Sequence, residues 1–180
     1  MSIRRRFLIS SAINQPQNPN PGGGSGDDSD IIITGNNVIY YTTTDGNIVS
    51  QFNEDAFSAN VVYNTYSRGR GIMVFDTDLY DIYEGAFCAT TEYSNLEAIV
   101  LPPSIFRIDN NTFKGCPYLN IFTLKSTPPN IGDPFTGVVN LFDPTILQNK
   151  NFTIYVPEDA LNSYLYNQNW RVYKDYIKGI

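Results

Sequence analysis

Two stretches of the chain carry the same apolar pattern, MVFDTDLYDIYEGAF at residues 73–87 and IVLPPSIFRIDNNTF at residues 99–113. Each begins with two apolar residues that are separated by one other residue, and this two-residue period is typical of a strand with one buried face. Five apolar positions match at one constant offset, that from Met73 to Ile99, which indicates an internal repeat. The matched residues are Met73, Phe75, Leu79, Ile82 and Phe87, then Ile99, Leu101, Ile105, Ile108 and Phe113. One unit cannot cover its own apolar face, so the units are predicted to stack.

The strand half of the repeat occurs once more. The spacing of three apolar residues, Leu96, Ile99 and Leu101, occurs again at Leu119, Phe122 and Leu124. This second offset is three residues shorter than the offset from Met73 to Ile99. The three extra residues of the first interval are expected on an outer loop over residues 88–95. Proline pairs at 102–103 and 128–129 end two of these strands, because proline cannot donate to a sheet ladder. The Ile-x-x-Ile segment is then expected to return as a turn or short helix.

The C-terminal segment, residues 152–180, has the pattern of a cap. A strand over residues 152–156 is followed by Pro157 and two acidic residues, a typical helix start. The apolar residues that follow at helical spacing are Leu161, Tyr164, Leu165, Trp170, Tyr173 and Ile177. The pattern predicts one C-terminal helix that closes the end of the repeat domain.

The N-terminal part divides by composition. Residues 14–30 are rich in Pro, Gly, Ser and Asp and are interpreted as a linker, because they cannot bury enough apolar surface to fold. Residues 31–71 contain strand-like runs and form a β-rich leader. Residues 72–180 are the repeat domain with its cap. Residues 1–13 remain as a separate arm.

The quoted segments resemble the BspA-type leucine-rich repeats of gut Bacteroidetes and of the phages and mobile elements that live in them. The matching text is IYEGAF at 82–87, NLEAIVLP at 95–102, IDNNTFKGCPYL at 108–119 and TIYVPEDAL at 153–161. VIYYTTTDG at 38–46 is similar to a leader that often precedes such repeats. The resemblance covers about residues 36 to 177. It implies a β-rich α/β solenoid, a short leucine-rich-repeat domain with a β-rich leader and a C-terminal capping helix. For function it implies binding only.

The composition argues against most catalytic classes. The chain has 18 acidic and 12 basic residues, a net charge of −6 and no histidine. Nucleic-acid binding is therefore not expected, and the commonest general base and metal ligand is missing. No apolar run is long enough to span a membrane. We expect no enzyme activity, no cofactor and no metal site.

Individual residues give the same answer. The acidic residues Asp76, Asp78 and Asp81 fail the calcium-loop pattern, which needs glycine and glutamate where Asp81 and Phe87 stand. The segment Gly69-Arg70-Gly71 is interpreted as a turn. Cys88 and Cys116 are interpreted as core or edge cysteines. A set of tyrosines has two open interpretations, a contact patch for protein or carbohydrate, or plain cross-strand packing: Tyr80, Tyr83, Tyr93, Tyr118, Tyr155 and Tyr166.

The arm carries the predicted partner site. Three basic residues precede three apolar ones, which is typical of a docking peptide for an acidic groove on a protein partner: Arg4, Arg5, Arg6, Phe7, Leu8 and Ile9. The apolar stretch is too short for the core of a secretory signal. Ser10 and Ala12 nevertheless have the small-x-small spacing of a cleavage site, so an atypical export signal stays open.

The favoured function is a non-enzymatic accessory virion protein of a gut bacteriophage, associated with the capsid, a head fibre or the tail. The arm would bind a capsid or other virion protein, and the repeat domain would be displayed, with a host surface protein or glycan as its candidate ligand. The alternative is a bacterial cell-surface adhesion module. A homo-oligomer is a further open alternative, because several arms would act together.

Overall fold

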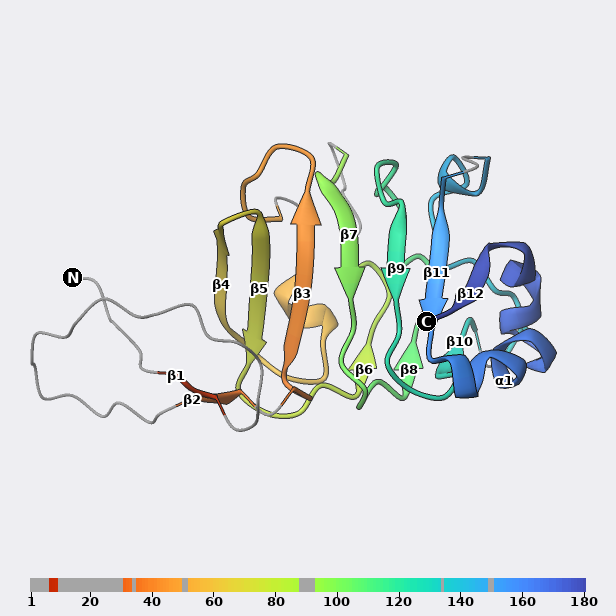
Figure 1. The fold of residues 1–180 in the computed structure, drawn as a ribbon, viewed down its shortest axis with the longest axis horizontal. Helices are drawn as coiled ribbons and strands as arrows, with labels where there is room; N and C mark the ends of the chain where they lie inside the picture. Colours follow the sequence, from red (N-terminus) through yellow and green to blue (C-terminus); the bar gives the residue numbers. More distant parts are fainter. Residues whose placement is uncertain are drawn as a thin grey trace, which may run out of the picture.

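The computed structural model describes the strands at residues 7–9 and 31–33, and residues 35–49, 52–87, 93–133, 135–148 and 151–180. These residues form three sheets, of seven, three and two strands. Figure 1 shows the strands of the largest sheet side by side, with the helical segment 158–176 at the C-terminal end of the molecule and the short helix 54–56 beside β3. The main core lies between the seven-stranded and the three-stranded sheet.

The seven-stranded sheet contains strands of both directions, in the order β12-β11-β9-β7-β3-β5-β4. Neighbours are parallel from β12 to β7 and antiparallel from β7 to β4. The strands are β3 (Val38–Thr43), β4 (Val61–Ser67), β5 (Arg70–Phe75), β7 (Leu96–Val100), β9 (Ile121–Thr123), β11 (Thr153–Val156) and β12 (Ile177–Gly179).

The three-stranded sheet is parallel and made of two-residue strands in the order β10-β8-β6. From β5 to β11 the chain alternates between these two sheets, so each passage across the molecule adds one strand to each sheet in turn. The strands are β6 (Asp81–Ile82), β8 (Arg107–Ile108) and β10 (Asn130–Ile131).

The pairing register reproduces the sequence repeat. Ile82 lies opposite Ile108, its partner at the first offset of the repeat, and Ile99 lies opposite Phe122, its partner at the shorter second offset. All ten residues matched at the first offset are buried. The predicted equivalence of these positions is therefore confirmed, because apolar side chains at equal intervals occupy equal places in successive passages.

One leader strand separates the repeat units in the large sheet. β3 lies between β5 and β7 and is antiparallel to both, so the strands carrying Met73 and Ile99 are not neighbours. β3 pairs with β5 at Tyr41 and Gly71, and the Tyr41 ring lies against the Gly71 backbone. Only glycine leaves room for the ring, because a Cβ atom at this position would come within 2.1 Å of the ring carbons. Direct stacking of the first two units, as expected from the sequence, occurs only in the three-stranded sheet.

The expected fold class, a β-rich α/β solenoid of leucine-rich repeats, is wrong. The chain is mostly β, and the return segments expected as turns or short helices form the parallel strands β6, β8 and β10. Their backbone groups pair with the preceding passage, as in the bonds from Phe106 N to Tyr80 O (2.7 Å) and from Asn130 N to Phe106 O (2.8 Å). Pairing in one parallel sheet satisfies the backbone of these segments better than one-turn helices, whose end groups would stay unpaired.

A chain of aromatic rings fills the core between the two sheets. Phe113 stacks on Phe87 (ring centroids 5.4 Å apart) and on Phe142 (5.7 Å), and it meets Phe122 edge to face at 5.2 Å. Phe57 extends the chain towards η1 (Glu54–Ala56), where it packs on Phe87. Offset and edge-to-face rings add to the apolar burial that holds the sheets together.

The predicted single capping helix is also wrong. The C-terminal segment begins as predicted at Pro157, but it breaks at residues 167–169, and Ile177 lies in β12 rather than on a helix. The elements are η3 (Glu158–Ala160), α1 (Leu161–Tyr166) and η4 (Trp170–Tyr176), with η2 (Ile146–Gln148) earlier in the chain. The break occurs where the Asn167 side chain accepts from the amides of Asn169 (2.9 Å) and Trp170 (3.2 Å), which starts a new turn.

Tyrosine burial makes the fold sensitive to alkaline pH. Burial raises the pKa of Tyr164 above the usual value of 10.0. The protonated hydroxyl donates a hydrogen bond to Ser126 O (2.9 Å). The pKa of Tyr173 is raised for the same reason. Above about pH 10 the unfolded chain therefore releases protons that the folded chain keeps, and stability falls.

We expect urea midpoints of the wild type to be constant below about pH 9 and to fall above about pH 10. Tyr164→Phe should flatten this alkaline decline and cost about 1 kcal/mol at neutral pH, because one hydrogen bond is lost. Tyr166→Phe is the control, since Tyr166 is exposed and should leave the profile unchanged. A decline of equal steepness in Tyr164→Phe would contradict this explanation.

Candidate functional site

The outer face of the seven-stranded sheet presents one continuous row of side chains. The pairing registers align one residue from each of six strands: Ile72, Tyr40, Val100, Thr123, Tyr155 and Lys178. Because side chains alternate along a strand, these residues point away from the core, while their neighbours Ile39, Tyr41 and Ile99 point into it. All members except Thr123 are partly or fully exposed.

Tyr40 is the centre of this row's charge pattern. The guanidinium carbon of Arg70 lies 5.8 Å from the centroid of the Tyr40 ring, and the Lys125 ammonium nitrogen lies 6.0 Å from it. Arg70 stands two positions before the row on β5, and Lys125 stands two positions after it, just beyond β9. Since β5 and β9 run in the same direction, the two cations bracket Tyr40 from opposite sides. Both contacts are within the usual range of cation–π attraction.

This face is basic within an acidic protein. The strands of the seven-stranded sheet contain one acidic residue, Glu97, whose carboxylate accepts a hydrogen bond from Thr42 Oγ1 (3.2 Å). They contain Arg70 and Lys178, and Lys125 follows shortly after β9, although the chain as a whole has six more acidic than basic residues. The strands of this sheet are therefore net basic, unlike the chain as a whole.

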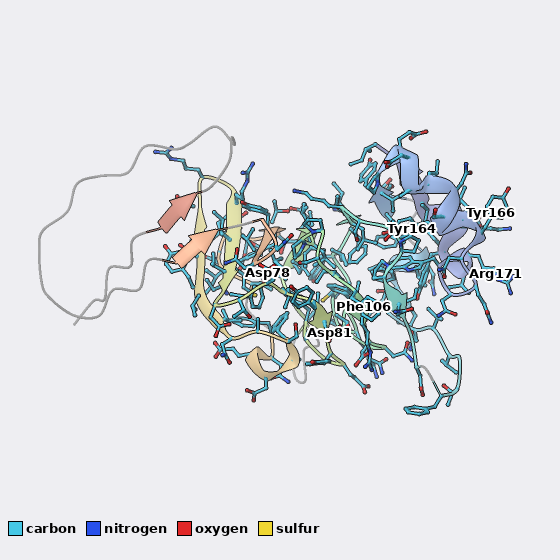
Figure 2. The ribbon with its side chains drawn as sticks, turned by 90° about the horizontal axis from the view of Figure 1, so that it is seen from below. Asp78, Asp81, Phe106, Tyr164, Tyr166 and Arg171 are labelled. Carbon is cyan, nitrogen blue, oxygen red and sulfur yellow. The ribbon has the colours of Figure 1, made fainter. Side chains whose placement is uncertain are left out.

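Several carboxylates lie in the strands of the three-stranded sheet or in the segments that lead into and out of them, among them Asp78, Asp81 and Asp109. Figure 2 shows Asp78, Asp81 and Phe106 in the middle of the molecule, apart from Tyr164, Tyr166 and Arg171 at the C-terminal end. Asp78 accepts a hydrogen bond from Asn36 Nδ2 (3.2 Å). Asp76 accepts from the backbone amide (2.9 Å) and the side-chain amide (2.7 Å) of Asn60, and the side-chain bond is the larger cause of its lowered pKa. These two carboxylates hold turns together.

The structure shows little of the predicted arm site. Arg4, Arg5 and Arg6 lie outside the described residues. Phe7, Leu8 and Ile9 form β1 (Phe7–Ile9), which pairs in parallel with β2 (Ile31–Ile33). A strand at 31–33 was expected from the sequence, whereas a strand at 7–9 was not. The arm as a docking site therefore stays a prediction.

The other singled-out residues divide clearly. Arg68 and Gly69 both have positive φ values (52° and 77°) and form the two-residue turn between β4 and β5. The turn predicted at Gly69-Arg70-Gly71 is therefore confirmed at Gly69 alone, because Arg70 and Gly71 already belong to β5. Cys116 is buried, as predicted, and its thiol donates to Phe87 O (3.0 Å). Cys88 lies outside the described residues. Within the described ranges, no three residues of the His, Cys, Asp and Glu types form a group that could hold a metal ion.

The six tyrosines do not share one face. Tyr155 belongs to the outer row, while Tyr80 lies in the loop before β6 and Tyr166 ends α1. The residues that matter most on the outer face, Tyr40 and Arg70, were missed as contact residues because each was interpreted only as part of a strand or turn. The alternation of Tyr40 and Thr42 with buried neighbours in β3 was the available signal.

No protein family matches the sequence, and no curated protein matches it. No helix in the described part of the chain combines the length and apolar character needed to cross a membrane. The arrangement of the outer face is thus the main guide to function.

Proposed function

We propose that the protein is a non-enzymatic binding protein, an accessory virion protein of a gut bacteriophage that is attached by residues 1–13 and displays the β-sheet domain. The observation that carries the binding role is the outer row from Ile72 to Lys178, which is half-buried or exposed except at Thr123 and in which aromatic, aliphatic and basic side chains stand in register on one sheet. Such a surface is suited to binding a partner rather than to catalysing a reaction.

The frame behind this face supports the proposal. Each outer residue except Lys178 is flanked along its strand by buried residues, such as Ile39 and Tyr41 beside Tyr40 and Ile99 beside Val100. Side chains held on a packed sheet lose little conformational entropy on binding. The face is therefore preorganised for a ligand or partner.

The attachment role rests on the sequence of the arm. Residues 1–13 combine three arginines with an apolar patch, and residues 14–30 separate them from the leader. If extended, this linker reaches at most about 50 Å, which would keep the display face clear of the particle. Arginine and apolar residues together are typical of protein-contact anchors.

Deletion of residues 1–13 should abolish association with phage particles, while circular dichroism and the thermal midpoint of the β-sheet domain change little. Co-sedimentation of the purified protein with particles that lack it measures the association. Deletion of residues 14–26, which is equally long, is the matched control and should leave binding intact. Retained co-sedimentation of the protein lacking residues 1–13 would refute attachment by the arm.

The bacterial surface module is the competing function, favoured by the small-x-small spacing of Ser10 and Ala12. N-terminal sequencing of the mature protein separates the two. A new N-terminus near Ala12 would mean that the arm is removed by export, and the virion assignment would then be abandoned.

A further inference from the structure

Two tyrosines of the outer row are spaced like contact points for an extended ligand. Tyr40 on β3 and Tyr155 on β11 occupy the same row, with Val100 and Thr123 on the two strands between them. Three strand spacings place the two residues about 14 Å apart. A linear ligand that runs across the strands meets both tyrosines in turn.

Basic residues accompany both tyrosines. Arg70 and Lys125 bracket Tyr40, and Lys178 lies opposite Tyr155 in the register of β11 and β12. Arg70, Lys125 and Lys178 are exposed, and none of them forms an ion pair with a carboxylate of the described residues. Cations gathered without counter-charges on an otherwise acidic protein are available to a negatively charged ligand.

We propose that the outer face binds a linear, carboxylate-bearing polysaccharide across its strands, with Tyr40 and Tyr155 against the sugar rings and Arg70, Lys125 and Lys178 on the carboxylates. Tyrosine offers a flat ring for the apolar side of a sugar and a hydroxyl for its polar edge. The inference rests on the proposed display function and specifies its ligand.

Features of the row favour a polysaccharide over an acidic protein. Thr42, which is half-buried, follows Tyr40 on the same face of β3, so a hydroxyl group accompanies that ring. The row contains no Trp, Phe, Leu or Met of the kind that anchors protein interfaces in a buried pocket. A tyrosine with a basic residue near it occurs twice across the sheet, at Tyr40 and at Tyr155, which suits a repeating polymer. A neutral glycan fits this face less well, because it would desolvate the unpaired cations without offering them a negative charge, and its affinity would be lower.

The test measures binding of the full chain to polygalacturonate by affinity electrophoresis and calorimetry, with dextran as the neutral control. We expect the double substitution Arg70→Gln with Lys125→Gln to weaken binding at least tenfold, and added salt to weaken it in the wild type. Arg171→Gln with Lys174→Gln removes the same charge at the exposed C-terminal end and should leave the affinity unchanged. Tyr40→Phe should retain most of the affinity, and Tyr40→Ala should lose it.

Several results would overturn the assignment. The first is that the protein does not bind polygalacturonate, the second is that both double variants lose the same share of the affinity, and the third is that dextran binds as tightly as polygalacturonate. Binding of poly-L-glutamate at the same strength would assign the face to acidic proteins, and binding of oligothymidylate would assign it to single-stranded nucleic acid. Each of these leaves the arm-deletion result unaffected, so failure of the ligand assignment is distinguishable from failure of virion attachment.

Discussion

Phe113→Ala is expected to lower the free energy of unfolding by about 3–5 kcal/mol, the range for emptying a fully buried phenylalanine site. Phe113 has no exposed surface and contacts the rings of Phe87, Phe122 and Phe142. Its backbone also bridges to Phe142, and its amide donates to Leu141 O (2.9 Å). The surrounding strands are short and paired on both sides, so they cannot collapse into the space left behind.

Urea unfolding followed by circular dichroism gives this value. Phe106→Ala is the matched control in the same passage of the chain, because Phe106 is 64% exposed and should change stability by less than about 0.5 kcal/mol. Phe113→Leu should restore part of the loss by refilling the volume. A loss below about 1 kcal/mol for Phe113→Ala would show that the aromatic chain does not hold the two sheets together.

Trp170→Ala is expected to cost a similar amount, about 3–5 kcal/mol, and to release the C-terminal segment. Trp170 is fully buried and packs edge to face on Tyr164, with ring centroids 5.2 Å apart. Its indole nitrogen donates to Pro129 O (2.8 Å), which ties η4 to the proline pair that precedes β10. Truncation removes the ring and leaves that carbonyl without its partner.

Two further substitutions separate these contributions. Trp170→Phe keeps most of the apolar volume and loses the hydrogen bond, so it should cost less than Trp170→Ala. Val172→Ala, at an exposed position of the same element, should be close to neutral. Because Trp170 is the only tryptophan of the chain, its fluorescence in the wild type reports unfolding of this end directly. Limited proteolysis should cut Trp170→Ala first between α1 and η4. Equal protease resistance of Trp170→Ala and the wild type would contradict the assigned role.

The elements that the sequence predicted well are those with local signals. Gly69 marked the turn between β4 and β5, although the turn lies one to two residues earlier than predicted, and the start of the cap follows from Pro157 and the acidic residues after it. The register of Ile82 with Ile108 follows from equal spacing of buried side chains. These features depend on a few neighbouring residues or on a repeated interval.

The candidate binding face depended on pairing that no local pattern announces. Tyr40 meets Arg70 and Lys125, both far from it in sequence, only because β3 enters the sheet between β5 and β7. An apolar strand such as β3 pairs equally well at an edge or in the interior of a sheet as far as its own sequence is concerned. The choice is made by the neighbours available on both sides.

The sequence by itself determined the repeat with its two intervals, the residues of the core and the acidic overall charge, because periodic burial and composition are properties of the chain alone. Tertiary structure decided that the return segments of the repeat form a second sheet, that β3 interrupts the stack, and that three cations share one face with Tyr40 and Tyr155. The physical reason is that backbone hydrogen bonds between distant segments must all be satisfied at once, and only the folded chain settles which segments become neighbours.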